Sequence, residues 1–321
     1  MDLKNFEEIP SLDLNDFIHG DEETKQNFVK KLGDAWTEIG FVAVKNHGLD
    51  ENDRTHLYNA VQQFFTLPHE VKVKYEDPEI QGQRGYIGKM KEHAKGYDAP
   101  DLKEFYHIGQ LNDQNDPDTQ EYPQNVFPEE VPDFETYGLK AFKTLEQAGI
   151  YLLQAVALYL GLDEHYFDDK VRNGNSILRP IHYFPMTDGA ELPEDSVRAA
   201  QHTDINLITL LMGASADGLQ VLRRDGEWIP ITALPEQIVV NVGDMLSRLT
   251  NNKLSSTVHR VVNPPKELRH LPRFSIPFFM HPKSAMDLSC LPECIDDDHP
   301  KLFSDITAGN YLQERLKEIG F

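Results

Sequence analysis

The sequence predicts a mainly β fold with flanking helices, whose core is an antiparallel barrel or jelly roll. Beyond residue 176 the hydrophobic pattern changes from a helical period to short apolar runs, which are typical of strands. Turn sequences such as NPP and RDG separate these runs, and many short strands between turns favour a barrel or jelly roll. Amphipathic stripes in the preceding half predict helices beside this core. A chain of 321 residues suits one such unit with an appended helical region.

The amino-terminal region is predicted to be helical and mixed. IPSLDL is typical of a short strand before a helix cap, and the later FVAVKNH is typical of an apolar strand. Apolar residues at helical spacing predict a helix within 21–46 and another over 50–66. From about 76 to 133, Gly, Pro and Asp residues predict loops with short ordered pieces, and loops of this length usually serve a site.

Residues 134–161 form the strongest predicted helix, because apolar residues recur along one face at three- or four-residue steps. The predicted strands then follow as ILRPIHYF, INLITLLMG, GLQVL, GEWIPI, IVVNVG, TVHRVVN and RFSIPFFM. The final segment TAGNYLQERLKEIG predicts a capping helix. We therefore divide the chain into an amino-terminal region (1–133), connecting helices (134–175), a β core (176–285) and a carboxy-terminal capping segment (286–321).

Composition limits the classes of partner. The sequence has 53 acidic and 31 basic residues, and its formal charge of -22 repels phosphate backbones and anionic lipid. No apolar run approaches the length of a membrane span, and the first residues lack a secretory signal pattern. We therefore expect a cytoplasmic protein with a small-molecule substrate and no nucleic acid or membrane partner, and the oligomeric state stays open. Cys290 and Cys294 are too few for a disulfide framework, so we expect reduced thiols.

His202 and Asp204 form the first candidate metal-binding motif. They lie two apart in the strand-like segment QHTDINL, and residues i and i+2 of a strand point to the same face. The spacing alone is weak, because 13 histidines and 53 acidic residues among 321 positions predict about two such matches by chance, and the sequence has two. The other match, His19 and Asp21, lies at a glycine turn before a helix and serves as an internal comparison.

His259 distinguishes the two matches. It lies in TVHRVV on another predicted strand, and a barrel can return that strand beside the one that carries His202 and Asp204. Two histidines and one carboxylate on adjoining strands form the facial arrangement of non-haem Fe(II) oxygenases. Zinc with three protein ligands and water uses the same ligand types, so these three residues alone leave the metal open.

Arg273 and Ser275 form the only R-x-S in the chain, on a predicted strand that follows His259. An arginine that points into a barrel beside a metal requires an anion, and the guanidinium fork suits a carboxylate. A surface salt bridge is the alternative interpretation, and the preceding triad makes the carboxylate clamp the better one.

In order and spacing these motifs resemble the isopenicillin N synthase-like branch of the 2-oxoglutarate- and Fe(II)-dependent dioxygenases. The resemblance rests on HTD, then GLQVL, VNVGDML and TNN, then HRV and RFS, and it covers residues 176–282 closely. IPSLDL and FVAVKNHG also resemble the amino-terminal region of that family. The resemblance implies a double-stranded β-helix, or jelly roll, with the metal at one mouth.

The resemblance also implies a role for each motif. His202, Asp204 and His259 would bind Fe(II), and Arg273 and Ser275 would hold the distal carboxylate of 2-oxoglutarate. The implied reaction hydroxylates or desaturates a small organic substrate with O2 and releases succinate and CO2. The alternatives are a synthase-like oxidase that grips a carboxylate of its own substrate, a zinc hydrolase, and a noncatalytic metal-binding barrel.

A further cosubstrate contact implied by the resemblance is the tyrosine of an N-x-Y-P stretch. The matching segment here is IHYFP, in which Tyr183 is the candidate and Ile181 replaces the asparagine. His182 is the alternative, and the two side chains face opposite ways on a strand, so only one can contact the cosubstrate.

Residues that line or cover the cavity are harder to predict. The candidates for substrate contact are Arg84, Tyr86, Phe105 and Phe279. Lys103 and His107 lie in the same loop region, and ordinary packing is an equally good interpretation of each. Asp244 in NVGDML is interpreted as a residue that fixes a turn, and His281 before a proline as a surface or packing residue.

Overall fold

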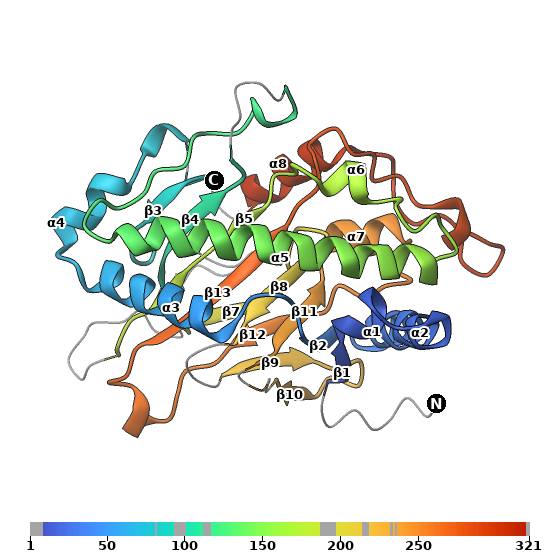
Figure 1. Ribbon diagram of the computed structural model, residues 1–321, viewed down its shortest axis with the longest axis horizontal. Coiled ribbons are helices and arrows are strands. Elements are labelled where there is room, and N and C mark those ends of the chain that lie inside the picture. The colour runs from blue at the N-terminus through green and yellow to red at the C-terminus, as the bar shows by residue number, and fades with distance from the viewer. Residues whose placement is uncertain are drawn as a thin grey trace.

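The computed structural model describes residues 9–80, 82–92, 101–111, 117–186, 197–213, 218–231, 234 and 236–318, which form two sheets and a layer of helices (Figure 1). The larger, nine-stranded sheet runs in the order β1 (Ser11–Asp13), β2 (Phe41–Lys45), β11 (Ile238–Val242), β8 (Ile208–Met212), β13 (Arg273–Met280), β5 (Ile177–Leu178), β4 (Glu104–Gly109) and β3 (Gly85–Ile87), with β6 (Ile181–Tyr183) paired to β13 and β4. The smaller, four-stranded sheet runs β10 (Trp228–Pro230), β9 (Leu219–Leu222), β12 (His259–Val261) and β7 (Ala199–His202).

The seven apolar runs predicted beyond residue 176 are confirmed as strands. β8, β11 and β13 are buried along nearly their whole length, because helices cover one face of the larger sheet and the other face is turned inward. ILRPIHYF divides into β5 and β6 at Arg179 and Pro180, since a proline has no N–H to donate to a strand ladder. Every strand pair is antiparallel except β1 with β2 among the described residues.

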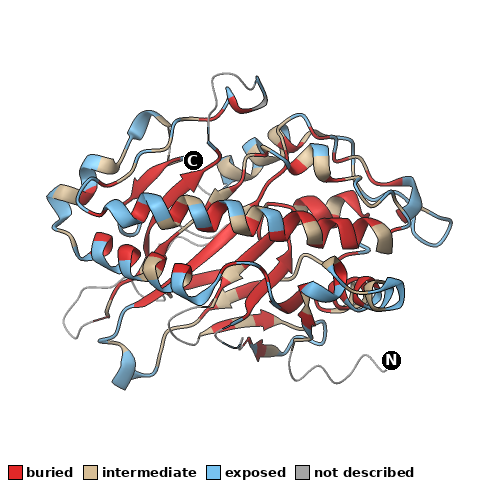
Figure 2. Cartoon of the chain, in the orientation of Figure 1, coloured by how far each residue is buried: buried red, intermediate tan, exposed pale blue. Residues whose placement is uncertain are grey.

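Three long helices cover the larger sheet: α2 (Glu22–Glu38), α3 (Glu51–Thr66) and α5 (Pro132–Tyr159). The carboxylates of Asp21 and Asp50 cap α2 and α3 by accepting from the backbone N–H three residues later. α5 crosses the sheet with one buried face in its first half, as the spacing of its apolar residues predicts, and is buried on nearly all sides from Ala148 to Ala157 (Figure 2). The shorter helices are α1 (Leu14–Ile18), α4 (His69–Lys72), α6 (Asp168–Val171), α7 (Asp244–Leu249) and α8 (Ala308–Glu318).

The short ordered pieces predicted within residues 76–133 include β3 and β4, which join the larger sheet. β4 is buried over all six residues, so this part of the amino-terminal region belongs to the same sheet as the β core. β1 and β2 extend that sheet at its other end. Among the described residues, no helix combines the length and apolarity needed to cross a membrane. Cys290 and Cys294 are buried free thiols.

A buried ionic cluster joins β4 to α4, β3 and β6. The carboxylate of Glu104 accepts hydrogen bonds from Nζ of Lys72 at 2.8 Å, from Nδ1 of His182 at 2.8 Å and from the hydroxyl of Tyr86. Burial alone would raise the pKa of Glu104, but these hydrogen bonds and the charge of Lys72 lower it to about 2. A lowered folded-state pKa stabilises the fold above the ordinary value of 4.5, and this contribution is lost as the pH falls toward 2.

Lys72→Met is therefore expected to lower the free energy of unfolding by about 3–5 kcal/mol at pH 7, because it leaves a buried carboxylate without its cation. Urea denaturation measures the loss, which should shrink as the pH falls from 4.5 toward 2. Lys30→Met removes the cation of an exposed ion pair with Asp34 and is the matched control, with almost no expected effect. Equal, small losses in the two variants would show that the buried pair does not stabilise the fold.

Candidate metal centre and active-site cavity

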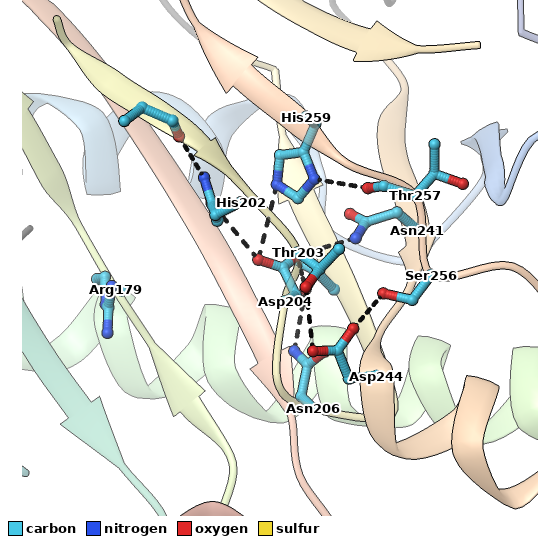
Figure 3. A network of polar contacts seen from close by, with 12 residues as sticks. Arg179, His202, Thr203, Asp204, Asn206, Asn241, Asp244, Ser256, Thr257 and His259 are labelled. Atoms are coloured by element: carbon cyan, nitrogen blue, oxygen red, sulfur yellow. Dashed lines mark hydrogen bonds and ion pairs between the residues drawn. The ribbon is translucent and has the colours of Figure 1, made fainter. Parts of the chain in front are cut away.

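His202, Asp204 and His259 converge where β7 and β12 lie side by side (Figure 3). The antiparallel register of the two strands sets His259 directly opposite His202. Oδ1 of Asp204 lies 3.8 Å from Nε2 of His202 and 3.7 Å from Nε2 of His259. The ligand atoms of all three residues lie within 4.8 Å of one another, which is close enough for one metal ion.

The route by which Asp204 reaches this point differs from the prediction. β7 ends at His202, so Asp204 lies beyond the strand and not on the same pleated face. The turn after β7 brings its carboxylate back toward the two histidines. The prediction that both residues lie on one strand is wrong in this detail, although the two side chains do meet.

Backbone carbonyls orient both imidazole rings. Nδ1 of His202 lies 2.8 Å from the oxygen of Ala200, and Nδ1 of His259 lies 3.1 Å from the oxygen of Thr257. Because a carbonyl only accepts, each Nδ1 carries the proton and each Nε2 keeps a lone pair directed toward Asp204. Desolvation and the neighbouring His259 lower the pKa of His202 to about 4, which favours the neutral ring that a metal requires.

The two oxygens of Asp204 have different surroundings. Oδ2 accepts from Oγ1 of Thr209 at 2.6 Å and from Nδ2 of Asn241 at 2.8 Å, whereas Oδ1 faces the histidines. Nδ2 of Asn206 donates in turn to Oγ1 of Thr209 at 2.9 Å. Burial opposes ionisation of Asp204, but the two histidines and these hydrogen bonds hold its pKa below the ordinary value. An ionised, oriented carboxylate beside two imidazoles suits a divalent metal.

Asp244, the first residue of α7, ties together the segments that carry the three side chains (Figure 3). Its carboxylate accepts from the hydroxyl of Thr203 at 3.0 Å and from that of Ser256 at 2.6 Å. Its backbone N–H donates to the oxygen of Asp204 at 2.7 Å. These contacts agree with the interpretation of Asp244 as a residue that fixes a turn.

Thr209→Val tests the support of the carboxylate, because it removes a hydrogen-bond donor with little change in volume. We expect Fe(II) affinity to fall by about 10–100-fold, the usual effect of losing a hydrogen bond to a metal ligand. Anaerobic Fe(II) titration measures this affinity. Thr250→Val removes a buried hydroxyl that bonds to the oxygen of Leu246, and this control should leave the affinity unchanged. Equal affinities in the two variants would contradict the assignment.

The predicted carboxylate clamp lines a cavity of about 1120 Å³ that also contains the three converging residues. Arg273 and Ser275 both face this cavity from β13, and the side chain of Arg273 is only 1% exposed. Its guanidinium carbon lies 4.9 Å from the centre of the ring of Tyr183, which also lines the cavity. His182 points the opposite way and donates to Glu104. The structure therefore brings Tyr183, not His182, beside the clamp.

The four residues proposed for substrate contact divide into two pairs. Arg84 and Phe279 line the cavity. Tyr86 does not, because its hydroxyl is directed to a buried carboxylate of β4 on the other side of the sheet. Phe105 is covered by Arg179, whose guanidinium carbon lies 4.5 Å from the centre of its ring, so it does not reach the cavity wall.

Lys103 and His107, named with the same loops, also line the cavity as part of an ionic network. Nζ of Lys103 lies 2.7 Å from Glu92, and Nη1 of Arg179 lies 3.4 Å from the same carboxylate. Nε of Arg179 donates to Nε2 of His107 at 2.6 Å. Burial and the charge of Arg179 hold the pKa of His107 well below its ordinary value, so the ring stays neutral and can accept.

Sequence reasoning did not assign many residues of the cavity wall, among them Asn175, Arg179 and His281. His281 is buried, which agrees with a packing residue and not with a surface one, and it also lines the cavity. Arg179 lies between β5 and β6, and His281 directly follows β13, so strand alternation does not place either side chain. Their short distance along the sequence from Tyr183 and Ser275 is the signal that could have found both.

Two family models match the chain. Residues 175–282 match the 2OG-Fe(II) oxygenase superfamily, and residues 9–130 match the amino-terminal region of non-haem dioxygenases in morphine synthesis. The chain is 32% identical to the proline hydroxylase buaE of Petromyces alliaceus, over 96% of this chain and 98% of that protein. It is 30% identical to the 2-oxoglutarate-Fe(II) type oxidoreductase ppzD of Metarhizium rileyi, over 96% of this chain and 90% of that protein.

Solved structures show the same similarity. A 2OG-Fe(II) oxygenase family protein from Caulobacter crescentus is 40% identical, with a TM-score of 0.85, and the match covers 97% of this chain and 98% of that one. A full-length Neurospora crassa protein, solved in complex with alpha-KG and thymine, is 32% identical, with a TM-score of 0.84 and 99% of each chain covered. The chain therefore belongs to the 2OG-Fe(II) oxygenase superfamily and is an Fe(II)- and 2-oxoglutarate-dependent dioxygenase.

Proposed function

We propose that His202, Asp204 and His259 hold the iron of this dioxygenase through Nε2, Oδ1 and Nε2. The observation that carries the proposal is the arrangement of hydrogen bonds, which occupies Nδ1 of each ring and Oδ2 of the carboxylate and leaves the three inward atoms together. Two imidazoles and one carboxylate leave coordination positions for cosubstrate and O2. When bound, iron supplies the redox chemistry that activates O2.

The residues of β13 and β6 are proposed to bind 2-oxoglutarate. Arg273 supplies a buried positive charge for the distal carboxylate, and Ser275 lies two residues further on the same face. The ring of Tyr183 lies against the guanidinium and restricts its movement. Arg179 and Phe279 form another part of the same cavity wall, where the primary substrate can lie beside the metal centre.

The finer family placement is also a proposal. The order HTD, GLQVL, VNVGDML, HRV and RFS supports the isopenicillin N synthase-like branch. Two facing sheets, with β8, β11 and β13 in one and β7, β9 and β12 in the other, support a jelly-roll core over residues 176–285. The matches to residues 9–130 and 175–282 support the division into an amino-terminal region, connecting helices, a core and a capping segment.

The reaction is proposed to be hydroxylation or desaturation of a small organic molecule. Relatives include a proline hydroxylase and a protein solved with thymine, so ring compounds of this size are the first to screen. Succinate release in the presence of Fe(II), 2-oxoglutarate and O2 is the test, across thymine, L-proline, small carboxylic acids, amino acids and phenolics. We expect iron-dependent release that a substrate stimulates. Failure to release succinate, or activity that zinc supports, would overturn the proposal.

A further inference from the structure

Arg84 is a buried cation in the wall of the same cavity. Its side chain is 0% exposed, and its Nη1 donates to the oxygen of Gln83 at 2.7 Å. Nε and Nη2 have no hydrogen-bond partner among the residues that the structure describes. These two nitrogens form one edge of the guanidinium, and that edge binds a carboxylate side-on through two parallel hydrogen bonds.

The fold holds this guanidinium in a fixed place. A Cβ atom at Gly109 would overlap with Cζ of Arg84, so the side chain lies directly on the glycine. Gly109 pairs with Ile177 of β5, and Ile177 pairs in turn with Phe279 of β13. Adjacent strands lie about 5 Å apart, so Arg84 is roughly two strand spacings from Phe279 across the sheet.

Two more buried polar atoms lie near the same strands. Oδ1 of Asn175 and Nδ1 of His281 have no hydrogen-bond partner in the described part of the chain, and both residues line the cavity. Asn175 lies two residues before the start of β5, and His281 directly follows the last residue of β13. Arg84, Asn175 and His281, each with an unpartnered buried polar atom, therefore line the same cavity.

The charge of Arg84 decides what this group of residues can bind. Burial lowers its pKa to about 10, so it remains a cation at neutral pH. No carboxylate within the described ranges forms an ion pair with it. A guanidinium buried without an anion is strongly unfavourable, and binding of an anionic group removes that penalty.

We propose that Arg84 receives a carboxylate of the primary substrate, so that the substrate is a small carboxylic acid, and that Asn175 and His281 bind a second polar group of it. This inference rests on the proposed function. It assigns the carboxylate of 2-oxoglutarate to Arg273 and the carboxylate of the primary substrate to Arg84. Because both ligands carry a carboxylate, the experiment must distinguish 2-oxoglutarate from the primary substrate at Arg84.

The test uses the full chain reconstituted anaerobically with Fe(II) and 2-oxoglutarate. A broad panel of small carboxylic acids, each paired with its primary amide, is screened by the shift in Tm and then, with O2, by stimulated succinate release. L-Proline with L-prolinamide and benzoate with benzamide are two such pairs. We expect acids to bind and stimulate, and the matching amide to be weaker by about 100-fold, because it lacks the charge that the guanidinium pairs with.

Three variants then locate the effect. Arg84→Gln should lower kcat/KM for the best acid by about 100-fold without raising the KM for 2-oxoglutarate. Gly109→Ala keeps the charge but displaces the guanidinium, and it should raise the KM for the acid while sparing 2-oxoglutarate. Arg223→Gln, which removes an exposed arginine already paired with Asp225 and Glu227, is the control.

The outcomes that overturn the inference are separate from failure of the proposed function. Binding of amides as strong as that of acids, or binding of no acid in the panel, overturns it. A raised KM for 2-oxoglutarate in Arg84→Gln would assign Arg84 to the cosubstrate, and this result also overturns the inference. If Arg84→Gln does not fold, the KM of Gly109→Ala for the acid tests the inference in its place, and an unchanged KM overturns it. Loss of substrate-independent succinate release in the unmodified protein would contradict the proposed function itself.

Discussion

Asp204→Ala is expected to abolish Fe(II)-dependent turnover. The variant removes the one anionic group of the triad, so Fe(II) affinity should fall by more than the roughly 10–100-fold that loss of a supporting hydrogen bond causes. The fold should persist, because Asp204 lies at a cavity wall and not within the apolar core clusters. Anaerobic Fe(II) titration, succinate release and Tm measure the three expectations separately.

The sequence offers a matched control for this variant. Asp21→Ala alters the other H-x-D motif, whose aspartate caps α2 by accepting from the N–H of Thr24. It should shorten or loosen the start of that helix and leave iron binding and turnover unchanged. If Asp204→Ala kept both iron binding and turnover, the triad would be the wrong assignment.

Arg273→Ala should raise the KM for 2-oxoglutarate on the order of 100-fold or more, because truncating one partner of a buried charge pair costs roughly 2–5 kcal/mol. Fe(II) affinity should be unchanged, since the arginine is not among the three converging side chains. Steady-state succinate release against 2-oxoglutarate concentration gives the KM, and Fe(II) titration gives the affinity.

Arg273→Lys is the companion variant, because it keeps the charge and loses the planar fork. Its KM for 2-oxoglutarate should lie between those of the unmodified protein and Arg273→Ala. An alanine variant with neither KM nor turnover altered would show that the clamp is elsewhere. A raised KM for the primary substrate alone would favour an oxidase that grips the carboxylate of its own substrate.

The strand-rich half was predictable because its apolar runs are nearly continuous and separated by turn residues. β8, β11 and β13 correspond to INLITLLMG, IVVNVG and RFSIPFFM, and α5 follows its helical stripe closely. β3 and β4 were not named as strands, since Gly and Asp residues surround them and β4 joins the rest of the larger sheet only through the distant β5 and β6. Pairing between segments far apart in the chain leaves little trace in local periodicity.

The site was predictable where its residues share a strand face with a motif. Arg273, Ser275 and Tyr183 lie together because β13 and β6 pair in register. Tyr86 was named with Arg84 because the loops beside a barrel mouth can fold over it, but the short β3 turns the hydroxyl of Tyr86 toward the ionic cluster instead. That cluster joins residues from α4, β3, β4 and β6, which no local spacing indicates.

The family assignment decides between some of the function hypotheses and leaves other predictions untested. Membership of the superfamily agrees with a 2-oxoglutarate-dependent dioxygenase and not with a zinc hydrolase or a noncatalytic barrel. The cytoplasmic location stays a prediction from the sequence. The absence of nucleic acid and membrane partners stays a prediction from the formal charge of -22. The identity of the primary substrate depends on the cavity residues, of which Arg84 is the most informative.

The central claim is that His202, Asp204 and His259 form an iron site that accepts 2-oxoglutarate. Anaerobic addition of Fe(II) and 2-oxoglutarate to the apoprotein tests it most directly by visible absorption. A weak charge-transfer band that is present in the unmodified protein and lost in Asp204→Ala is the predicted result. Absence of the band in the unmodified protein, with activity retained on zinc, would contradict the claim.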